Sequence, residues 1–381
     1  MGTASDLSRK ALLPAAVLGL SGLLLAGCGA APEEEAPGAG SETGTESAST
    51  SAVGTENSDY TGCIVSDQGG FDDRSFNQSS YEGLKSAEED FGIKVREAES
   101  TSPTDFTPNV NSMLQAGCDT IIGVGFLLGD TIKPIAAANE DTHFVGVDVT
   151  DPEFPDNVQR IIYDTAQGAF LAGYLSAGVS ETGKVATYGG AEIPTVTIFM
   201  DGFAAGVEYY NEQKDADVQV LGWNREAKTG SFTGDFENQA AGKTNTTNFI
   251  NEGADIIMPV AGPVGLGTLD AVTEANAAGK DAKVVWVDSD GYLTTDQGEV
   301  ILTSVMKLMG EAVHDVIEAD LAGEFSSEPY VGTLENGGVA LAPFHDLDSA
   351  VSEELKTELE EIKAGIIDGS ITVDSDYSPE S

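Results

Sequence analysis

The chain has 381 residues, of which 64 are Asp or Glu and 18 are Lys or Arg, giving a formal net charge of -46. A field of that sign argues against nucleic acid and against anionic lipid surfaces as partners. Because salt screens the self-repulsion of so acidic a protein, we interpret the acidity as adaptation to a salty environment. Three cysteines and three histidines are too few for a zinc site, so we expect no metal and no cofactor.

The N-terminus has the layout of an export signal. Arg9 and Lys10 precede an apolar stretch at 11–26, and the sequence LLAGC ends at Cys28. The stretch is shorter than the roughly 20 residues that a membrane span needs. Small residues before a cysteine are typical of a lipoprotein cleavage site, which would leave the Cys28 thiol free to take diacylglyceryl and palmitate-type lipid. We therefore expect a signal peptide at 1–27 and a mature chain held by lipid to the extracytoplasmic face of the cell membrane.

The next segment differs sharply in composition. Residues 28–59 are rich in Glu, Gly, Ser, Thr and Ala and have almost no large apolar side chains. Such a segment cannot bury enough surface to offset its ordering entropy, so we predict a lipid-anchored disordered linker. The remaining body of about 320 residues exceeds the usual size of a single core, which favours two domains.

The body alternates short apolar runs with amphipathic stretches, a pattern that predicts parallel sheets covered by helices on both faces. The pattern runs from 63–65 to 158–163 and then begins again at 184–188. We predict two doubly wound α/β lobes. Their expected bounds are 60–163, completed by about 289–322, for the first lobe, and 164–288, completed by about 323–375, for the second.

Three predicted strands end in aspartate, at Asp67, Asp148 and Asp288, and two others end in glycine-rich loops at 123–125 and 261–265. Ligands of open parallel sheets bind beyond the carboxyl ends of the strands, so these groups predict one ligand-binding cleft. The simpler interpretation of each aspartate is a helix cap or a turn former.

Cys63 and Cys118 begin two apolar runs that would form neighbouring strands. An exported domain tolerates disulfides, so the two cysteines are either bonded to each other or buried as free thiols.

The segment DQGGFDDRSFNQSSYEG at 67–83 resembles the N-terminal signature of the basic membrane protein (Bmp, PnrA-like) lipoproteins, the substrate-binding proteins of nucleoside ABC importers. Further stretches agree in order, including 189–194, 202–207 and 287–307, so that the resemblance covers about 60–325. It implies a type I periplasmic-binding-protein fold, in which two lobes are joined by a three-strand hinge and close over the ligand.

The resemblance also implies a set of ligand-binding residues. Asp67 and Asn77 would bond the base edge, and Phe76 and Phe232 would stack on the base from the two lobes. Trp223 and Phe236 compete with Phe232 for that position. Asp148 would also face the ligand from its strand end, and Gly262, Asp288 and Lys307 would hold the ribose hydroxyls. These types suit a nucleoside, which offers a flat face, a donor and acceptor edge, and a diol.

We therefore expect a monomer that captures a nucleoside and delivers it to an ABC transporter permease. Two alternatives would have the same fold. One is a binding protein for a pentose or hexose, and the other is a ligand-sensing lipoprotein. The sequence has no HExxH or GxSxG motif, so we expect no catalytic residues. Glycoside cleavage by Asp67 and Asp148 is the remaining enzyme hypothesis.

Overall fold

The computed structural model describes residues 57–379, all within one compact unit of the chain. The predicted signal peptide, Cys28 and nearly all of the predicted linker lie outside the described residues. Within 57–379, no helix has the length and apolar character that crossing a membrane requires.

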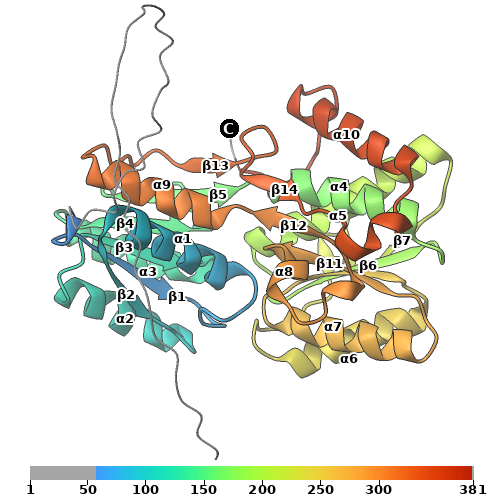
Figure 1. The fold of residues 1–381 in the computed structure, drawn as a ribbon, viewed down its shortest axis with the longest axis horizontal. Coiled ribbons are helices and arrows are strands. Elements are labelled where there is room, and N and C mark those ends of the chain that lie inside the picture. Colours follow the sequence, from blue (N-terminus) through green and yellow to red (C-terminus); the bar gives the residue numbers. More distant parts are fainter. Residues whose placement is uncertain (1–56, 380–381) are drawn as a thin grey trace, which may run out of the picture. The chain divides into compact units, whose positions relative to one another are not determined.

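The first lobe is built on a six-stranded parallel sheet in the order β13-β5-β4-β3-β1-β2 (Figure 1). Its strands are β1 (Thr61–Ser66), β2 (Lys94–Ala98), β3 (Thr120–Val124), β4 (His143–Val147), β5 (Val158–Tyr163) and β13 (Tyr330–Gly332). Its helices are α1 (Phe76–Phe91), α2 (Pro103–Gln115), the 3₁₀ turn η2 (Phe126–Leu128), α3 (Gly129–Ala137) and α9 (Met309–Leu321).

The second lobe has a six-stranded sheet in the order β14-β12-β11-β10-β6-β7, in which only β14 runs antiparallel to its neighbour. Its strands are β6 (Lys184–Gly189), β7 (Gln219–Leu221), β10 (Ile256–Val260), β11 (Lys283–Asp288), β12 (Ile301–Lys307) and β14 (Val339–Leu341). Its helical elements are α4 (Thr165–Val179), α5 (Pro194–Lys214), α6 (Gln239–Glu252), α7 (Val264–Ala277), α8 (Gly291–Thr294), η3 (Gly298–Val300), η4 (His345–Ala350) and α10 (Glu353–Ile367).

The central strands are buried along their whole length rather than alternating between buried and exposed residues. Every residue of β1, β3, β10 and β11 is buried. A strand buried on both faces needs helices on both sides of its sheet, which is the arrangement of doubly wound parallel sheets. The predicted fold class, two α/β lobes with parallel sheets, is confirmed.

The chain passes between the lobes three times, after β5, after β12 and between β13 and β14. The crossing segments are joined by backbone hydrogen bonds, from Asp164 N to Gly332 O at 2.9 Å and from Leu308 N to Gly338 O at 3.0 Å. These segments form the hinge that the resemblance implied.

The chain passes between the two lobes at other positions than we predicted. Residues 289–322 were expected to complete the first lobe, but β12 pairs with β11 in the second lobe, and only α9 packs against α1 of the first. Conversely β13, expected in the second lobe, pairs with β5 of the first. The reason is local: the short helix α8 and η3 return the chain directly to a parallel position beside β11.

The structure joins Cys63 and Cys118 by a disulfide across 55 residues of sequence. Cys63 lies in β1, which pairs with β3, and Cys118 lies two residues before β3 begins. This pairing brings the two Cα atoms to 6.0 Å, within the usual range for a disulfide.

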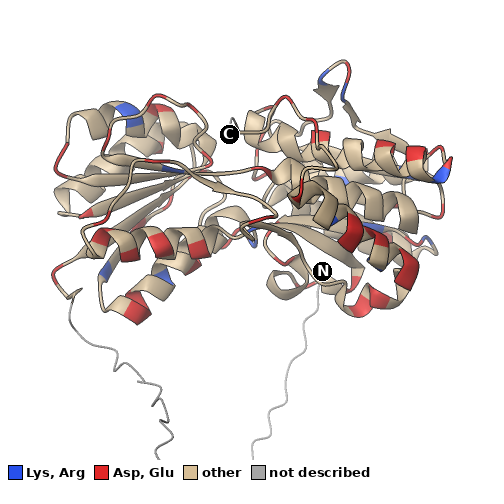
Figure 2. Ribbon diagram, turned by 90° about the horizontal axis from the view of Figure 1, so that it is seen from above, with Lys and Arg blue, Asp and Glu red and all other residues tan. Residues whose placement is uncertain are grey.

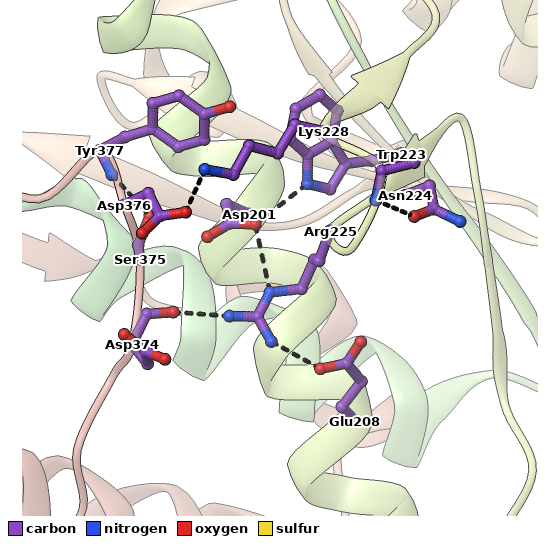
Figure 3. Close-up of polar contacts among 11 residues, drawn as sticks. Asp201, Glu208, Trp223, Asn224, Arg225, Lys228, Asp374, Ser375, Asp376 and Tyr377 are labelled. Atoms are coloured by element: carbon purple, nitrogen blue, oxygen red, sulfur yellow. Dashed lines mark hydrogen bonds and ion pairs between the residues drawn. The ribbon is translucent and has the colours of Figure 1, made fainter.

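Acidic residues are spread over the helices of both lobes, whereas Lys and Arg are sparse (Figure 2). One ordered cluster of charges holds the segment that follows α10 (Figure 3). There Arg225, next to the small hairpin β8 (Trp223–Asn224) and β9 (Thr229–Gly230), binds Glu208 at 2.6 Å, Asp201 at 3.2 Å and the carbonyl of Asp374 at 2.6 Å. Through these bonds the segment 374–377 is tied to the second lobe.

Candidate functional site

A cavity lies between the two lobes, where the carboxyl ends of their strands meet. It is lined by seven of the eight residues that the sequence predicted to bind the ligand. These are Asp67, Phe76, Asn77, Asp148, Gly262, Asp288 and Lys307. Residues up to 240 positions apart in the chain, from Asp67 to Lys307, thus meet at one place, because both sheets direct the carboxyl ends of their strands toward it.

Phe232 is the predicted residue that does not line the cavity. Its backbone forms an isolated bridge with Gly189, and its ring lies edge-on to Trp223 at 6.4 Å between centroids. Phe236, four residues further along, lines the cavity instead. The structure therefore places Phe236, and not the predicted Phe232, among the residues of the second lobe that line the cavity.

Lys307 contributes a positive charge to the wall of the cavity. It ends β12 and is only 3% exposed. Its Nζ lies 2.6 Å from Asp148 Oδ2 and 3.2 Å from Asp288 Oδ1, and 4.6 Å from the centre of the Phe76 ring. Burial opposes the charge on Lys307, but Asp148 and Asp288 outweigh it and hold the pKa of Lys307 above its ordinary value. Lys307 is therefore a buried cation.

Asn77 and Asp67 form a second polar group at the start of α1. Asn77 Nδ2 donates to Asp67 Oδ1 at 3.0 Å, whereas Asn77 Oδ1 is buried and accepts no hydrogen bond from any described residue. Burial raises the pKa of Asp67 to about 8, and the hydrogen bond from Asn77 opposes this shift only in part. Asp67 is therefore mostly protonated at neutral pH and able to donate a hydrogen bond.

Two glycines shape the cavity through their backbone. Gly125 follows β3 with φ of 118°, and a Cβ there would lie 2.1 Å from Asp67 Oδ2. Only glycine lets the Asp67 carboxyl approach the backbone so closely. Gly262 follows β10 with φ of 51°, and a Cβ on it would point into open space. Its bare backbone therefore faces the cavity.

Sequence reasoning missed several lining residues. Asp73 accepts hydrogen bonds from the backbone N–H groups of Ser75, Asn77 and Gln78, and so caps α1. An aspartate shortly before a helical pattern was a usable signal for this role. The other lining residues that we did not predict include Phe126, Thr195 and Phe199. Thr195 and Phe199 belong to α5, whose apolar residues read as core in sequence.

Residues 61–376 match the sequence model of a family described as ABC transporter substrate-binding protein PnrA-like, or Bmp. The chain belongs to this family. The resemblance drawn from the sequence is thereby confirmed, and the Bmp-family protein is a substrate-binding protein of an ABC transport system.

Two relatives have similar sequences over most of their length. The ABC transporter nucleoside-binding protein BmpA of Lactococcus lactis subsp. cremoris is 32% identical over 337 residues, covering 84% of this chain and 91% of the relative. Basic membrane protein A of Borreliella burgdorferi is 30% identical over 313 residues, covering 81% of this chain and 86% of the relative.

Among solved structures, the Bmp-family chain is similar to an ABC transporter solute-binding protein from Aeropyrum pernix K1. The TM-score is 0.74 at 24% sequence identity, covering 82% of this chain and 92% of that one. At this level of identity the likeness supports the fold, in agreement with the two sheets described above.

Proposed function

We propose that the protein captures a nucleoside between its two lobes and delivers it to the permease of an ABC transporter. The observation that carries this proposal is a buried acceptor atom in each lobe whose hydrogen-bonding capacity is not filled by residues 57–379. Asn77 Oδ1 belongs to the first lobe and Asp288 Oδ1 to the second, and both residues line the cavity. Within the described part of the chain, Asp288 Oδ1 has only the ion pair with Lys307, and Asn77 Oδ1 has no hydrogen-bond donor.

A buried acceptor with unfilled hydrogen-bonding capacity is unfavourable, so a ligand that supplies donors to both atoms gains binding free energy. A nucleoside has an amide or amine N–H on its base and hydroxyl groups on its sugar. Asn77 Oδ1 would accept from the base and Asp288 Oδ1 from the ribose. Lys307 would donate to a ribose oxygen, and the backbone at Gly262 would lie beside the sugar.

The aromatic residues fit the same ligand. Phe76 from the first lobe and Phe236 from the second both line the cavity, so a flat base would stack between them. Protonated Asp67, next to Asn77, would donate to a ring nitrogen or carbonyl of the base. The name of the Lactococcus relative, a nucleoside-binding protein, supports this choice of ligand.

The N-terminal sequence supports an extracytoplasmic location for this capture. An export signal followed by Cys28 would hold the protein by lipid on the extracytoplasmic face, with residues 28–59 as the tether. From there a monomer would reach the permease without spanning the membrane itself.

The test is a calorimetric titration of the protein with purine and pyrimidine nucleosides and with ribose and glucose. We expect micromolar or tighter binding of at least one nucleoside, about -8 kcal/mol or better, with the ligand recovered intact. Binding of a free sugar but no nucleoside would replace this proposal by the sugar-binding alternative. Release of free base would instead indicate a glycoside-cleaving enzyme.

A further inference from the structure

Ser75 lies at the N-cap position of α1 but makes no side-chain hydrogen bond to that helix. Serine is favoured at this position because its oxygen usually accepts from N–H groups of the first turn. Here Ser75 Oγ lies 3.0 Å from Asp288 Oδ2 and 3.1 Å from the carbonyl of Val287. Both acceptors belong to the second lobe, so this hydroxyl reaches from one lobe to the other.

Asp73, rather than Ser75, caps α1. Its carboxylate accepts from the backbone N–H of Ser75 at 3.0 Å, of Asn77 at 2.8 Å and of Gln78 at 3.0 Å. The first turn of the helix is therefore satisfied without the Ser75 hydroxyl. Removing that hydroxyl would leave the cap in place, which makes Ser75 testable by substitution.

The residue before Ser75 makes a second set of bonds to the other lobe. The carbonyl oxygen of Arg74 accepts from Ser289 Oγ at 2.9 Å and from Thr294 Oγ1 at 3.0 Å, with Trp286 Nε1 at 3.4 Å. Arg74 holds a left-handed backbone conformation, with φ of 62°, which is unfavourable for a residue with a Cβ. Such a conformation persists where surrounding bonds fix it.

We propose that Arg74 and Ser75 of the first lobe form a clasp with Ser289 and Thr294 of the second, and that Ser75 is a positioning residue for Asp288. The single hydroxyl proton of Ser75 goes to the Asp288 carboxylate rather than to a neutral carbonyl, because the charged acceptor is stronger. This bond holds Oδ2 and leaves Oδ1 for Lys307 and for a ligand hydroxyl.

The clasp links closure to ligand binding. Its bonds exist only while the two lobes are in contact, so they slow the reopening that releases the ligand. Ser75 also holds Oδ2 of the sugar-binding carboxylate only in that state, because Ser75 comes from the opposite lobe. This inference rests on the proposed function, since it assigns Asp288 to the sugar of a nucleoside.

A double-mutant cycle tests the positioning role. In the full-length protein, Ser75→Ala should weaken nucleoside binding about tenfold, the size expected for one hydrogen bond to a charged group. In an Asp288→Ala background the same substitution should change the affinity by less than about twofold, because the hydroxyl has lost the group that it positions. A merely structural role of Ser75 would instead give additive effects.

The second half of the clasp is tested by the double variant Ser289→Ala/Thr294→Val. Stopped-flow binding should show a dissociation rate raised about tenfold with a nearly unchanged association rate. The matched control is Thr295→Val, whose hydroxyl donates within its own segment to the carbonyl of Gly291 at 2.7 Å. That control should keep the wild-type rates.

The outcomes separate the two proposals. A wild-type protein that binds no nucleoside would overturn the proposed function and this inference with it. A wild-type protein that binds a nucleoside, combined with unchanged affinity in Ser75→Ala or additive effects in the cycle, would overturn the positioning role alone. Unchanged dissociation from Ser289→Ala/Thr294→Val would overturn the clasp, whether or not Ser75→Ala folds.

Discussion

Asp148 and Asp288 end central strands of the two lobes in the same left-handed backbone conformation, and both carboxylates reach the ammonium of Lys307. Their φ angles are 60° and 69°, and their distances to Lys307 Nζ are 2.6 Å and 3.2 Å. A positive φ is unfavourable for a residue with a Cβ and tends to persist at functional sites. One buried lysine thus forms ion pairs with a carboxylate from each lobe at the wall of the cavity.

Lys307→Met should therefore destabilise the protein strongly. Two carboxylates would stay buried without their cation, and breaking a buried ion pair in this way costs about 3–5 kcal/mol of unfolding free energy. Urea denaturation at neutral pH measures the loss. Lys94→Met, at an exposed lysine of β2 without an ion-pair partner among residues 57–379, should change stability little. A loss below about 1 kcal/mol in Lys307→Met would mean that the triad is not a tight charge network.

Phe236→Ala should weaken binding of a nucleoside and of its free base by similar factors, about tenfold, because stacking involves only the base. Phe232→Ala should keep the affinity within a few fold and lower the melting temperature instead, since this ring packs against Trp223 and Gly189. Calorimetry together with thermal unfolding distinguishes the two. The reverse pattern would restore Phe232 as the stacking residue.

The buried carboxyl of Asp67 predicts a pH dependence of stability. Its pKa rises from an ordinary 3.8 to about 8 in the folded protein, so the folded state keeps a proton that the unfolded chain releases. This contribution is fully present below about pH 4 and is lost as the pH rises to 8, at up to about 1.4 kcal/mol per pH unit. Asp67→Asn stays neutral throughout.

The free energy of unfolding of Asp67→Asn should therefore fall less between pH 5 and pH 8 than that of the wild type. Urea titrations at several pH values provide the comparison. Asn at this position can still accept from Asn77 Nδ2, so the fold should be retained. Parallel pH profiles for the two proteins would show that Asp67 is ionised in the folded state.

Cys28→Ser should release the protein from the membrane without changing its affinity for ligand, because the proposed lipidation site lies outside the segment 61–376 that matches the family. Detergent partitioning of cells that express each form measures the release. A Cys28→Ser protein that stays in the membrane fraction would indicate that the N-terminal segment anchors the chain by itself.

Most of the cavity could be predicted from sequence, because strand ends are local features. Asp148 and Asp288 follow apolar runs, and the parallel pattern places such ends at one edge of each sheet. Phe76 and Asn77 came from a short signature at the start of a helix. These residues depend little on how distant segments pack.

The features that the sequence did not predict correctly depend on how distant segments pack against one another. Phe232 and Phe236 are four residues apart in an irregular loop, and the bridge from Phe232 to Gly189 that decides between them leaves no periodic signal. The lobe membership of β12 and β13 depends on which sheet edge the chain reaches after each crossing. The cross-lobe bonds of Arg74 and Ser75 depend on the contact between lobes, and no local pattern encodes it.

The most direct test of nucleoside capture is the calorimetric titration of wild type and Asp288→Ala with one nucleoside and with its free base. Because Asp288 would bind only the sugar, we predict a loss of roughly tenfold or more for the nucleoside, at about 1.4 kcal/mol per decade. The affinity for the free base should stay within about twofold. If Asp288→Ala keeps its melting temperature and binds the nucleoside within about twofold of the wild type, Asp288 does not hold the ribose and the proposed mode of capture is wrong.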